Sequence, residues 1–435
     1  MVIVKNVKSF YIFLSQINLR KMSFISRRTN AILTVLVFSS IIVGASTQVI
    51  IASAATDIEL MIYTYESLLA DPGYNFVEGY SNYSGIPADH IKVVALEDAN
   101  SLITRLLGEK DNPVADVVIG LDNSLVFEAK QHGLLTPYSS PVLENISASL
   151  IDNLDPEHYL LPYDYGIIAF NYDSLRINTS TVPSLTNLTL NDLIRLDLIK
   201  NLVVEDPTLS SPGLGFLLWT IAVFGDPSLN FTGILGEDWR DWWQAAAPDL
   251  RVAPSWGAAF DIYYDANENR PIMVSYGTSP AYTVCQGWGD DLKAFLSHEN
   301  NSANAWLQIE GIALVQNGPH ALQGQDFIDW FLGEELQSQI PENNWMYPAN
   351  TQVQISSCFA EASINPNSVN ILNELIPPIF LEENLAYWKQ TWEETMAGKS
   401  PVISSYPNGV IFLITISFSV GLIYFMHRRR TFFSE

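Results

Sequence analysis

Several aromatic residues of this sequence stand next to Ser, Thr, Gly, Pro or Asn rather than inside apolar runs. Among them we single out Tyr65, Trp256, Tyr276, Tyr282 and Trp345. The face of an aromatic ring attracts cations, with about 0.5–2 kcal/mol per contact, and a carboxylate nearby adds charge complementarity. If these rings converge on one cleft, they predict a site for a flat, cationic, aromatic ligand. The alternative for each ring taken alone is ordinary core packing.

Motifs of catalysis are missing from the sequence. It has no G-x-S-x-G turn, no H-E-x-x-H, no phosphate-binding P-loop and no G-x-G-x-x-G. No two of its six histidines stand at metal-ligand spacing, and two cysteines exclude a disulfide-framework fold and a cysteine-rich zinc site. In a chain with 47 acidic residues, paired acids such as Asp290 and Asp291 favour a solvated face. We therefore predict a binding protein rather than an enzyme, with no catalytic residue, metal site or cofactor.

Three short apolar runs predict strands of a parallel sheet that must position such a ligand. They are residues 57–65, 91–96 and 115–120, with a helix expected at 100–108. Polar or aromatic residues stand at their carboxyl ends: 63–65, Glu97 with Asp98, and 121–123. Because ligands bind beyond the carboxyl ends of the strands in such sheets, these residues predict one shared site.

Two further runs, 162–171 and 271–276, predict strands that cross between two lobes. The expected fold class is α/β, with each lobe a mostly parallel sheet flanked by helices. The expected first lobe is discontinuous, from 57–165 and 277–397, with a mostly helical second part, and the second lobe is 166–276. Within the second lobe, a strand at 202–206 is followed by Ser210 and Ser211 ahead of a helix over 216–224. Free backbone N–H groups at such a helix start are able to bind a ligand.

The start of the chain has the order of a secretory signal peptide. Residues 1–56 carry six basic residues and no acid, and an apolar run at 31–54 ends in small residues. We expect residues 1–55 to be a leader, with translation starting at Met22; the alternative is an uncleaved signal anchor. The six N-x-Ser/Thr sequons between residues 82 and 302 also fit an exported surface.

The end of the chain has the pattern of a membrane anchor. Residues 410–426 are apolar and uncharged, at the short end of the length that spans a bilayer, and Arg428 to Arg430 follow. We predict a linker at 398–409, a single transmembrane helix at 410–426 and a cytoplasmic tail at 427–435; a buried core helix is the alternative for 410–426. Residues 57–409, with 13 basic and 46 acidic residues, would face outward. This acidic balance argues against nucleic acid as a partner.

Eight stretches, in this order along residues 57–395, resemble the thiamine-binding family of periplasmic solute-binding proteins, the receptors of ABC importers. They are YTYES at 63–67, VALED at 94–98, ADVVIGLDN at 115–123, PYDYG at 162–166, EDP at 205–207, SPGLGFLLW at 211–219, SYGTSPAY at 275–282 and IPENNWMYP at 340–348. The resemblance implies the type II periplasmic-binding fold, in which two lobes close on the ligand. It also implies that this chain binds thiamine or its phosphates and delivers the ligand to a permease and its ATPase subunit.

The resemblance also implies roles for individual residues. The positions expected to contact the ligand are Tyr65, Asp98, Ser210, Ser211, Trp256, Tyr276, Tyr282 and Trp345. Tyr276, Tyr282 and Trp345 would pack against the rings, and Trp256 would close from the second lobe. Asp98 would accept from the aminopyrimidine or offset the positive charge, and Ser210 would bind the hydroxyethyl or phosphate end.

Other interpretations stay open at this point. A related cleft would suit another cationic ligand, such as a polyamine or ferric ion. A thiamine-cleaving extracellular enzyme would need a nucleophile, for which Cys285 is the nearby residue. Cys285 and Cys358 either pair in a disulfide, which an exported compartment permits, or stay as two buried thiols. We expect a monomer.

Overall fold

The computed structural model describes residues 57–70 and 75–398. The predicted leader, transmembrane helix and cytoplasmic tail lie outside these residues, as does the predicted linker apart from Gly398. Across the two described ranges, no helix is both long enough and apolar enough to span a bilayer.

The first half of the sheet is built on the three predicted strands, which are confirmed. They are β1 (Leu60–Tyr65), β2 (Ile91–Leu96) and β3 (Val117–Asp122). Strand β1 pairs in parallel with both β2 and β3. The expected helix is α4 (Ala99–Glu109), and Asp98 caps its start by accepting a hydrogen bond from the amide of Ala99 at 2.6 Å.

One long strand was missed by the sequence prediction. Strand β12 (Leu307–Val315) lies between β3 and β5 (Leu161–Asp173) and is antiparallel to both. It lies in the part of the first lobe that was expected to be mostly helical, because a short apolar run predicts a buried helix and a buried strand equally well. The sheet is therefore mixed, and the expectation of a mostly parallel sheet was wrong here.

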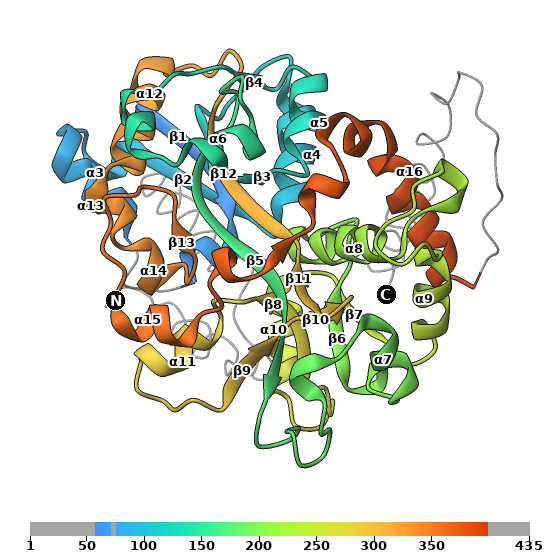
Figure 1. Cartoon of the computed structure of the whole chain (residues 1–435). Coiled ribbons are helices and arrows are strands. Elements are labelled where there is room, and N and C mark those ends of the chain that lie inside the picture. Colours follow the sequence, from blue (N-terminus) through green and yellow to red (C-terminus); the bar gives the residue numbers. More distant parts are fainter. Residues whose placement is uncertain (1–56, 71–74, 399–435) are drawn as a thin grey trace, which may run out of the picture. The chain divides into compact units, whose positions relative to one another are not determined.

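Strand β5 continues from the first half of the sheet into the second, as Figure 1 shows. There it pairs antiparallel with β8 (Ile272–Tyr276), which pairs in parallel with β6 (Leu202–Glu205), and β6 pairs with β7 (Arg251–Ala253). All eleven strands of this sheet are thus connected through β12 and β5. The shorter strands are β4 (Leu135–Thr136), β9 (Leu292–Phe295) and β13 (Tyr347–Pro348) beside it, and β10 (Ser297–Glu299), β11 (Ser302–Ala305) and β14 (Asn370–Ile371) in a small separate sheet.

Helices pack around these strands. They are α3 (Phe76–Ser84), α5 (Val126–Gln131), α6 (Ala148–Leu154), α7 (Leu190–Arg195), α8 (Ser211–Phe224), α9 (Trp239–Ala246), α10 (Trp256–Tyr264), α11 (Pro280–Cys285), α12 (Ala321–Leu332), α13 (Glu334–Gln337), α14 (Ile340–Asn343), α15 (Ser357–Ala362) and α16 (Pro378–Met396). Helix α8 is buried along its whole length. It begins five residues before the predicted start, with Pro212 in its first turn, where a missing N–H group costs no hydrogen bond.

The largest hydrophobic cluster joins segments that are far apart in the chain. Trp219 of α8 and Trp243 of α9 are buried in it together with Phe295 of β9 and Trp388 of α16. Figure 1 shows α16 beside α9. The expected boundaries place 277–397 in the first lobe, so they cut through this cluster. We therefore propose that β9, β11 and α16 pack as part of the second lobe.

Candidate functional site

A cavity of about 780 Å³ opens where the two halves of the sheet meet. Its walls come from the ends of β1, β2 and β8, from the starts of α4, α8 and α10, and from β12, α11 and the turn after α14. Because carboxyl ends of parallel strands and helix starts gather here, the position agrees with the usual ligand site of open α/β sheets. The volume suits a small organic molecule.

Seven of the eight predicted contact residues line this cavity together. They are Tyr65, Asp98, Ser211, Trp256, Tyr276, Tyr282 and Trp345. Ser210 does not line it, because this N-cap residue of α8 is fully buried behind the wall. The hydroxyl of Ser211 donates to the carboxylate of Asp122 at the end of β3. The backbone of Ser211 also hydrogen-bonds to Asp98 and acts to lower the pKa of that carboxyl group.

Two aromatic groups face the cavity from different elements. On α10, Trp256 stacks on Phe260 with ring centroids 5.0 Å apart, and its Nε1 donates to the hydroxyl of Ser275 at 2.9 Å. On α11, Tyr282 contacts Trp288 and Trp345 edge to face, with centroids 5.1 and 5.3 Å apart. These contacts hold the rings in place before any ligand arrives.

The backbone of Trp345 is left-handed, with φ 57°. For a residue with a side chain this conformation costs roughly 1–2 kcal/mol. The turn after α14 compensates in part, because the amide of Trp345 donates to the carbonyl of Ile340 at 3.1 Å. The strain places a large ring on the cavity wall, which is typical of a functional position.

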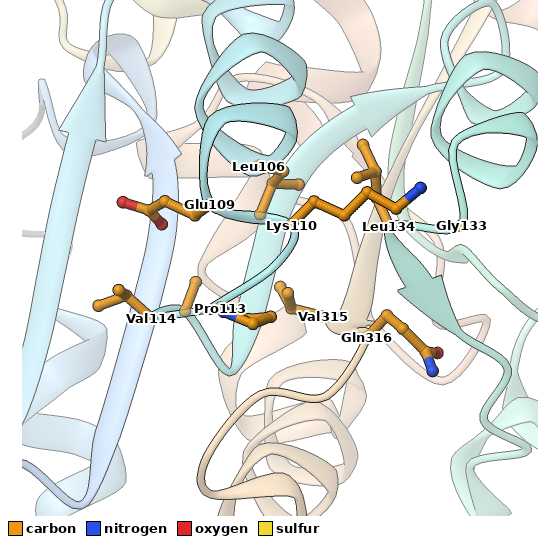
Figure 2. Close-up of a pocket in the computed structure, with 10 residues that line it drawn as sticks. Leu106, Glu109, Lys110, Pro113, Val114, Gly133, Leu134, Val315 and Gln316 are labelled. Carbon is orange, nitrogen blue, oxygen red and sulfur yellow. The ribbon is translucent and has the colours of Figure 1, made fainter.

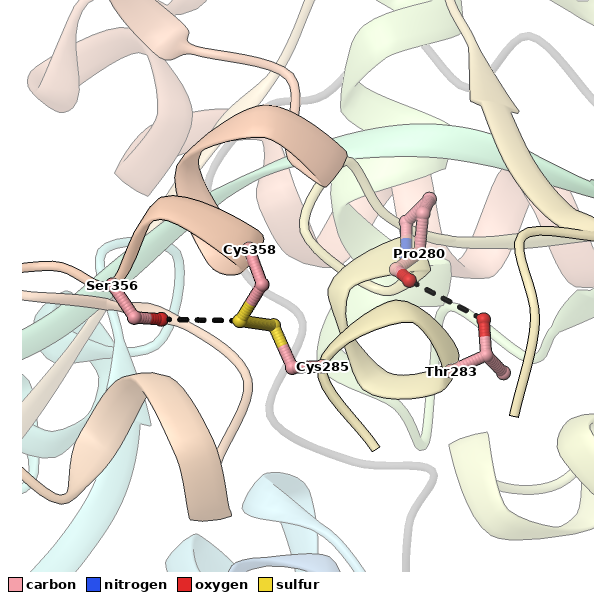
Figure 3. Close-up of a disulfide and its surroundings, with 5 residues drawn as sticks. All are labelled: Pro280, Thr283, Cys285, Ser356 and Cys358. Atoms are coloured by element: carbon pink, nitrogen blue, oxygen red, sulfur yellow. Dashed lines mark hydrogen bonds between the residues drawn. A yellow bond between two sulfur atoms is a disulfide. The ribbon is translucent and has the colours of Figure 1, made fainter. Parts of the chain in front are cut away.

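A disulfide supports the helix that carries Tyr282. Cys285 at the end of α11 is bonded to Cys358 of α15, with Cα atoms 5.4 Å apart, as Figure 3 shows. The pair joins residues 73 positions apart in sequence. The alternative of a thiamine-cleaving enzyme needed a free Cys285 thiol, and in the disulfide this sulfur is not a nucleophile.

The floor of the cavity holds a carboxylate that the sequence prediction missed. One oxygen of Glu310 accepts from the hydroxyls of Tyr65 and Tyr163, both at 2.6 Å. Its other oxygen accepts from the amide of Gln308 at 2.8 Å, and the same amide donates to the hydroxyl of Tyr276 at 2.8 Å. Glu310 is therefore linked to two of the aromatic residues that line the cavity.

Irregular strand pairing places Glu310 at this point. The pairing of β12 shifts register beside Gly311 on both its edges. At Gly120 of β3, φ is +103°, and an added Cβ would lie 2.2 Å from ring atoms of Tyr65. Only glycine lets the Tyr65 ring lie on the strand here. Bulges of this kind redirect side chains next to binding sites.

Burial dominates the electrostatics of the acids around the cavity. It raises the pKa of Asp98 to about 7, against the opposing hydrogen bond from the Ala99 amide. Burial also raises the pKa of Glu310 to about 7, against the hydroxyls of Tyr163 and Tyr65. The pKa of Asp164 lies well above its usual range, first from burial and then from the charge of Glu310. Burial raises the pKa of Asp122 as well.

The charges that line the cavity are all of one sign. Four carboxyl groups line it, those of Glu66, Glu97, Asp98 and Glu310. Among the described residues that line it there is no Lys, Arg or His. A buried acid without a cationic partner favours a positively charged ligand, since such a ligand offsets the cost of burying the charge. Rings and acids without a base therefore match a flat cation.

A second cavity, drawn in Figure 2, is far smaller. It lies between the end of α4 and the strand ends near Leu134 and Val315, and it holds about 10 Å³. This is about the space of one water molecule. It has no room for an organic ligand.

The chain is similar to known proteins over most of its length. Residues 112–226 match a family model described as bacterial extracellular solute-binding protein. The thiamine-binding periplasmic protein of Brucella abortus is 30% identical over 343 residues, 78% of this chain and 92% of that protein. The thiamine-binding periplasmic protein of Escherichia coli is 32% identical over 292 residues, 66% of this chain and 80% of that protein. The chain belongs to the family of the thiamine-binding periplasmic proteins.

Solved structures show the same fold. A periplasmic thiamin binding protein superimposes with a TM-score of 0.63 at 27% identity, covering 78% of this chain and 96% of that one. A ferric binding protein from Campylobacter jejuni superimposes with a TM-score of 0.61 at 20% identity, covering 78% and 99%. At that lower identity the likeness shows the fold alone. The predicted α/β periplasmic-binding fold is confirmed, and as solute-binding proteins the members of this family are not enzymes.

Several residues that line the cavity of this family member were not predicted. They are Phe260, Trp288, Glu310, Asn344 and Met346, among others. Trp288 meets the aromatic criterion, because it stands between Gly287 and Gly289, whereas Phe260 stands between Ala259 and Asp261 and does not. Glu310 was not, since it is a single acid inside an apolar run and only strand register reveals its neighbours.

Proposed function

We propose that this protein is an extracellular receptor that binds thiamine between its two lobes and delivers it to an ABC importer. The observation that carries the proposal is the cavity itself, in which aromatic rings and four carboxyl groups meet without any Lys, Arg or His among the described lining residues. Thiamine carries a permanently positive thiazolium and a flat aminopyrimidine. The rings suit both flat groups, and the acids suit the charge.

Within this proposal the predicted residues other than Ser210 keep their roles. Tyr276, Tyr282 and Trp345 pack on the ligand rings, and Trp256 contacts them from α10. Asp98, whose carboxylate already caps α4, accepts from the aminopyrimidine or offsets the charge. Ser210 does not line the cavity, so Ser211, which does, takes the role predicted for Ser210 at the hydroxyethyl or phosphate end.

Calorimetry on the full-length protein in detergent tests the proposal. Thiamine is expected to bind with micromolar or lower Kd and to quench the fluorescence of Trp256, Trp288 or Trp345. Thiamine phosphates, spermidine and ferric citrate belong in the same panel, because a polyamine or ferric receptor is the competing assignment. Absence of heat and quenching with thiamine and its phosphates refutes the proposal.

We further propose that the C-terminal segment 410–426 tethers the receptor to the membrane after removal of the leader 1–55. Support comes from the apolar, uncharged segment and from the three arginines after it. Alkaline carbonate extraction should leave the full chain in the membrane pellet and release a variant that ends at residue 398. Release of both forms would contradict the tether.

A further inference from the structure

Glu310 lies in the cavity floor without a cation. Its side chain is buried, with the residue only 6% exposed, yet it lines the cavity. Every hydrogen bond that it accepts comes from a neutral donor, namely Tyr65, Tyr163 and Gln308. Within residues 57–70 and 75–398, no ion pair includes it.

The neighbouring strands add negative charge rather than positive charge. Glu310 pairs in register with Asp122 on β3 and with Asp164 on β5. Three carboxyl groups therefore stand side by side across three adjacent strands, all of them buried. A buried carboxylate without a counter-charge is costly, and like charges nearby increase the cost. The charge of Lys389 partly offsets the raised pKa of Asp122. Glu310 forms no ion pair among the described residues, so a positive charge that relieves it would come from the cavity.

We propose that Glu310 is the counter-ion for the positive charge of the ligand and determines the selectivity of the cavity for cations over uncharged molecules of the same shape. This inference rests on the proposed function, since it concerns the same cavity. Three neutral donors aim the carboxylate, and Tyr65 and Tyr276, which line the cavity above it, are tied to it directly or through Gln308.

A purely structural role for Glu310 predicts something different. If the carboxylate only positions Tyr65 and Tyr276, its loss disturbs the packing of any flat ligand, charged or not. If it is the counter-ion, its loss weakens the binding of a cation alone. The charge of the ligand therefore separates the two roles.

The experiment uses thiamine and its uncharged analogue in which a thiophene ring replaces the thiazolium. Both are titrated by calorimetry into the full-length wild type and the Glu310→Gln variant in detergent. We expect Glu310→Gln to raise the Kd of thiamine about tenfold or more and that of the uncharged analogue less than about twofold. Equal loss for both ligands, or no loss for thiamine, overturns the proposal.

The control variant is Glu299→Gln, which removes a buried carboxylate on β10 outside the cavity. It is expected to leave both Kd values unchanged. Melting temperatures check that the variants fold. If Glu310→Gln does not fold, Glu310→Asp takes its place. The shorter side chain moves the charge away from the ligand, so this variant must raise the Kd of thiamine more than the Kd of the uncharged analogue.

Two failures are distinguishable. A wild type that binds no thiamine refutes the proposed function as well, whereas a Glu310 variant that changes both Kd values equally refutes this inference alone.

Discussion

Two buried acids in this molecule are satisfied in opposite ways. Asp226, after α8, is fully buried and accepts hydrogen bonds from the indole N–H groups of Trp239 and Trp388 at 3.1 and 3.0 Å. It also has a cation of its own, because the guanidinium of Arg240 lies 3.3 Å away. Glu310 is held by two tyrosines and one amide, with no cation among the described residues and with the cavity in front of it.

The difference indicates that Asp226 stabilises the fold, whereas Glu310 serves ligand binding. Asp226 connects α9 and α16, so its charge is neutralised within the fold and the same contacts exist with or without a ligand. The partner of Glu310 is missing from its surroundings, and a ligand is able to supply it. A buried acid that has its own cation thus predicts a stability effect on removal, whereas one without a cation predicts a binding effect.

The largest expected effect is on Asp226. Asp226→Ala leaves two buried indole N–H groups without their acceptor and removes one of the two acids that pair with Arg240, the other being Asp238. The unfolding free energy should therefore fall by about 3–5 kcal/mol. Thermal denaturation followed by circular dichroism measures it. Asp241→Ala, which removes an exposed acid from α9, is the control and should change stability by less than about 0.5 kcal/mol. A loss below about 1 kcal/mol in Asp226→Ala would mean that this pair is not needed to hold α9 and α16 together.

Glu310 should have a stability effect with a different signature, which depends on pH. Burial raises its pKa to about 7, so the folded state holds the proton more tightly than the unfolded chain does. Its contribution to stability is therefore complete below about pH 4.5 and is lost as pH rises through 7. The wild type should lose about 1–3 kcal/mol between pH 5 and pH 8 relative to Glu310→Gln. Parallel melting-temperature curves for the two proteins would contradict this.

Asp98 shares one property with each of these two acids: it lines the cavity, as Glu310 does, and it makes a structural contact, as Asp226 does. It therefore tests whether such an acid affects ligand binding or stability. Asp98→Ala should weaken thiamine binding by about 1–3 kcal/mol, because a partly buried charge opposite a cation is lost. Calorimetry measures the change, and Asp89→Ala, an exposed acid before β2, serves as the control. Unchanged affinity would assign Asp98 to the capping of α4 alone.

The strands β1, β2 and β3, which end at the cavity, were predictable from the sequence. The long-range packing of β12 and α16 was not. Local patterns located β1, β2 and β3 and the polar residues after them, and the rule for strand ends placed Tyr65 and Asp98 together. Glu310 was not predicted because its role depends on the pairing of strands that are far apart in the sequence. Strand β12 begins 185 residues after the end of β3, and it lies between β3 and β5 in the sheet. Only that pairing places the three acids side by side. The position of α16 was not predicted for a similar reason, since no local sequence pattern indicates that Trp388 packs in the same cluster as Trp243.

The smallest effect we expect is the pH dependence of ligand affinity. The pKa values of Asp98 and Glu310 are both raised to about 7. Tyr65 and Tyr163 donate hydrogen bonds to Glu310, and the acids Asp122 and Asp164 pair with it on the neighbouring strands. Below pH 7 these two carboxyl groups are mostly protonated and must release a proton when a cation binds, so thiamine affinity should rise by about tenfold from pH 5.5 to pH 8.5. Calorimetry in two buffers of different ionisation enthalpy measures the affinity and the proton released. The uncharged analogue should show neither effect. Equal pH dependence for the two ligands would mean that the titration reports on the fold and not on the charge of the ligand.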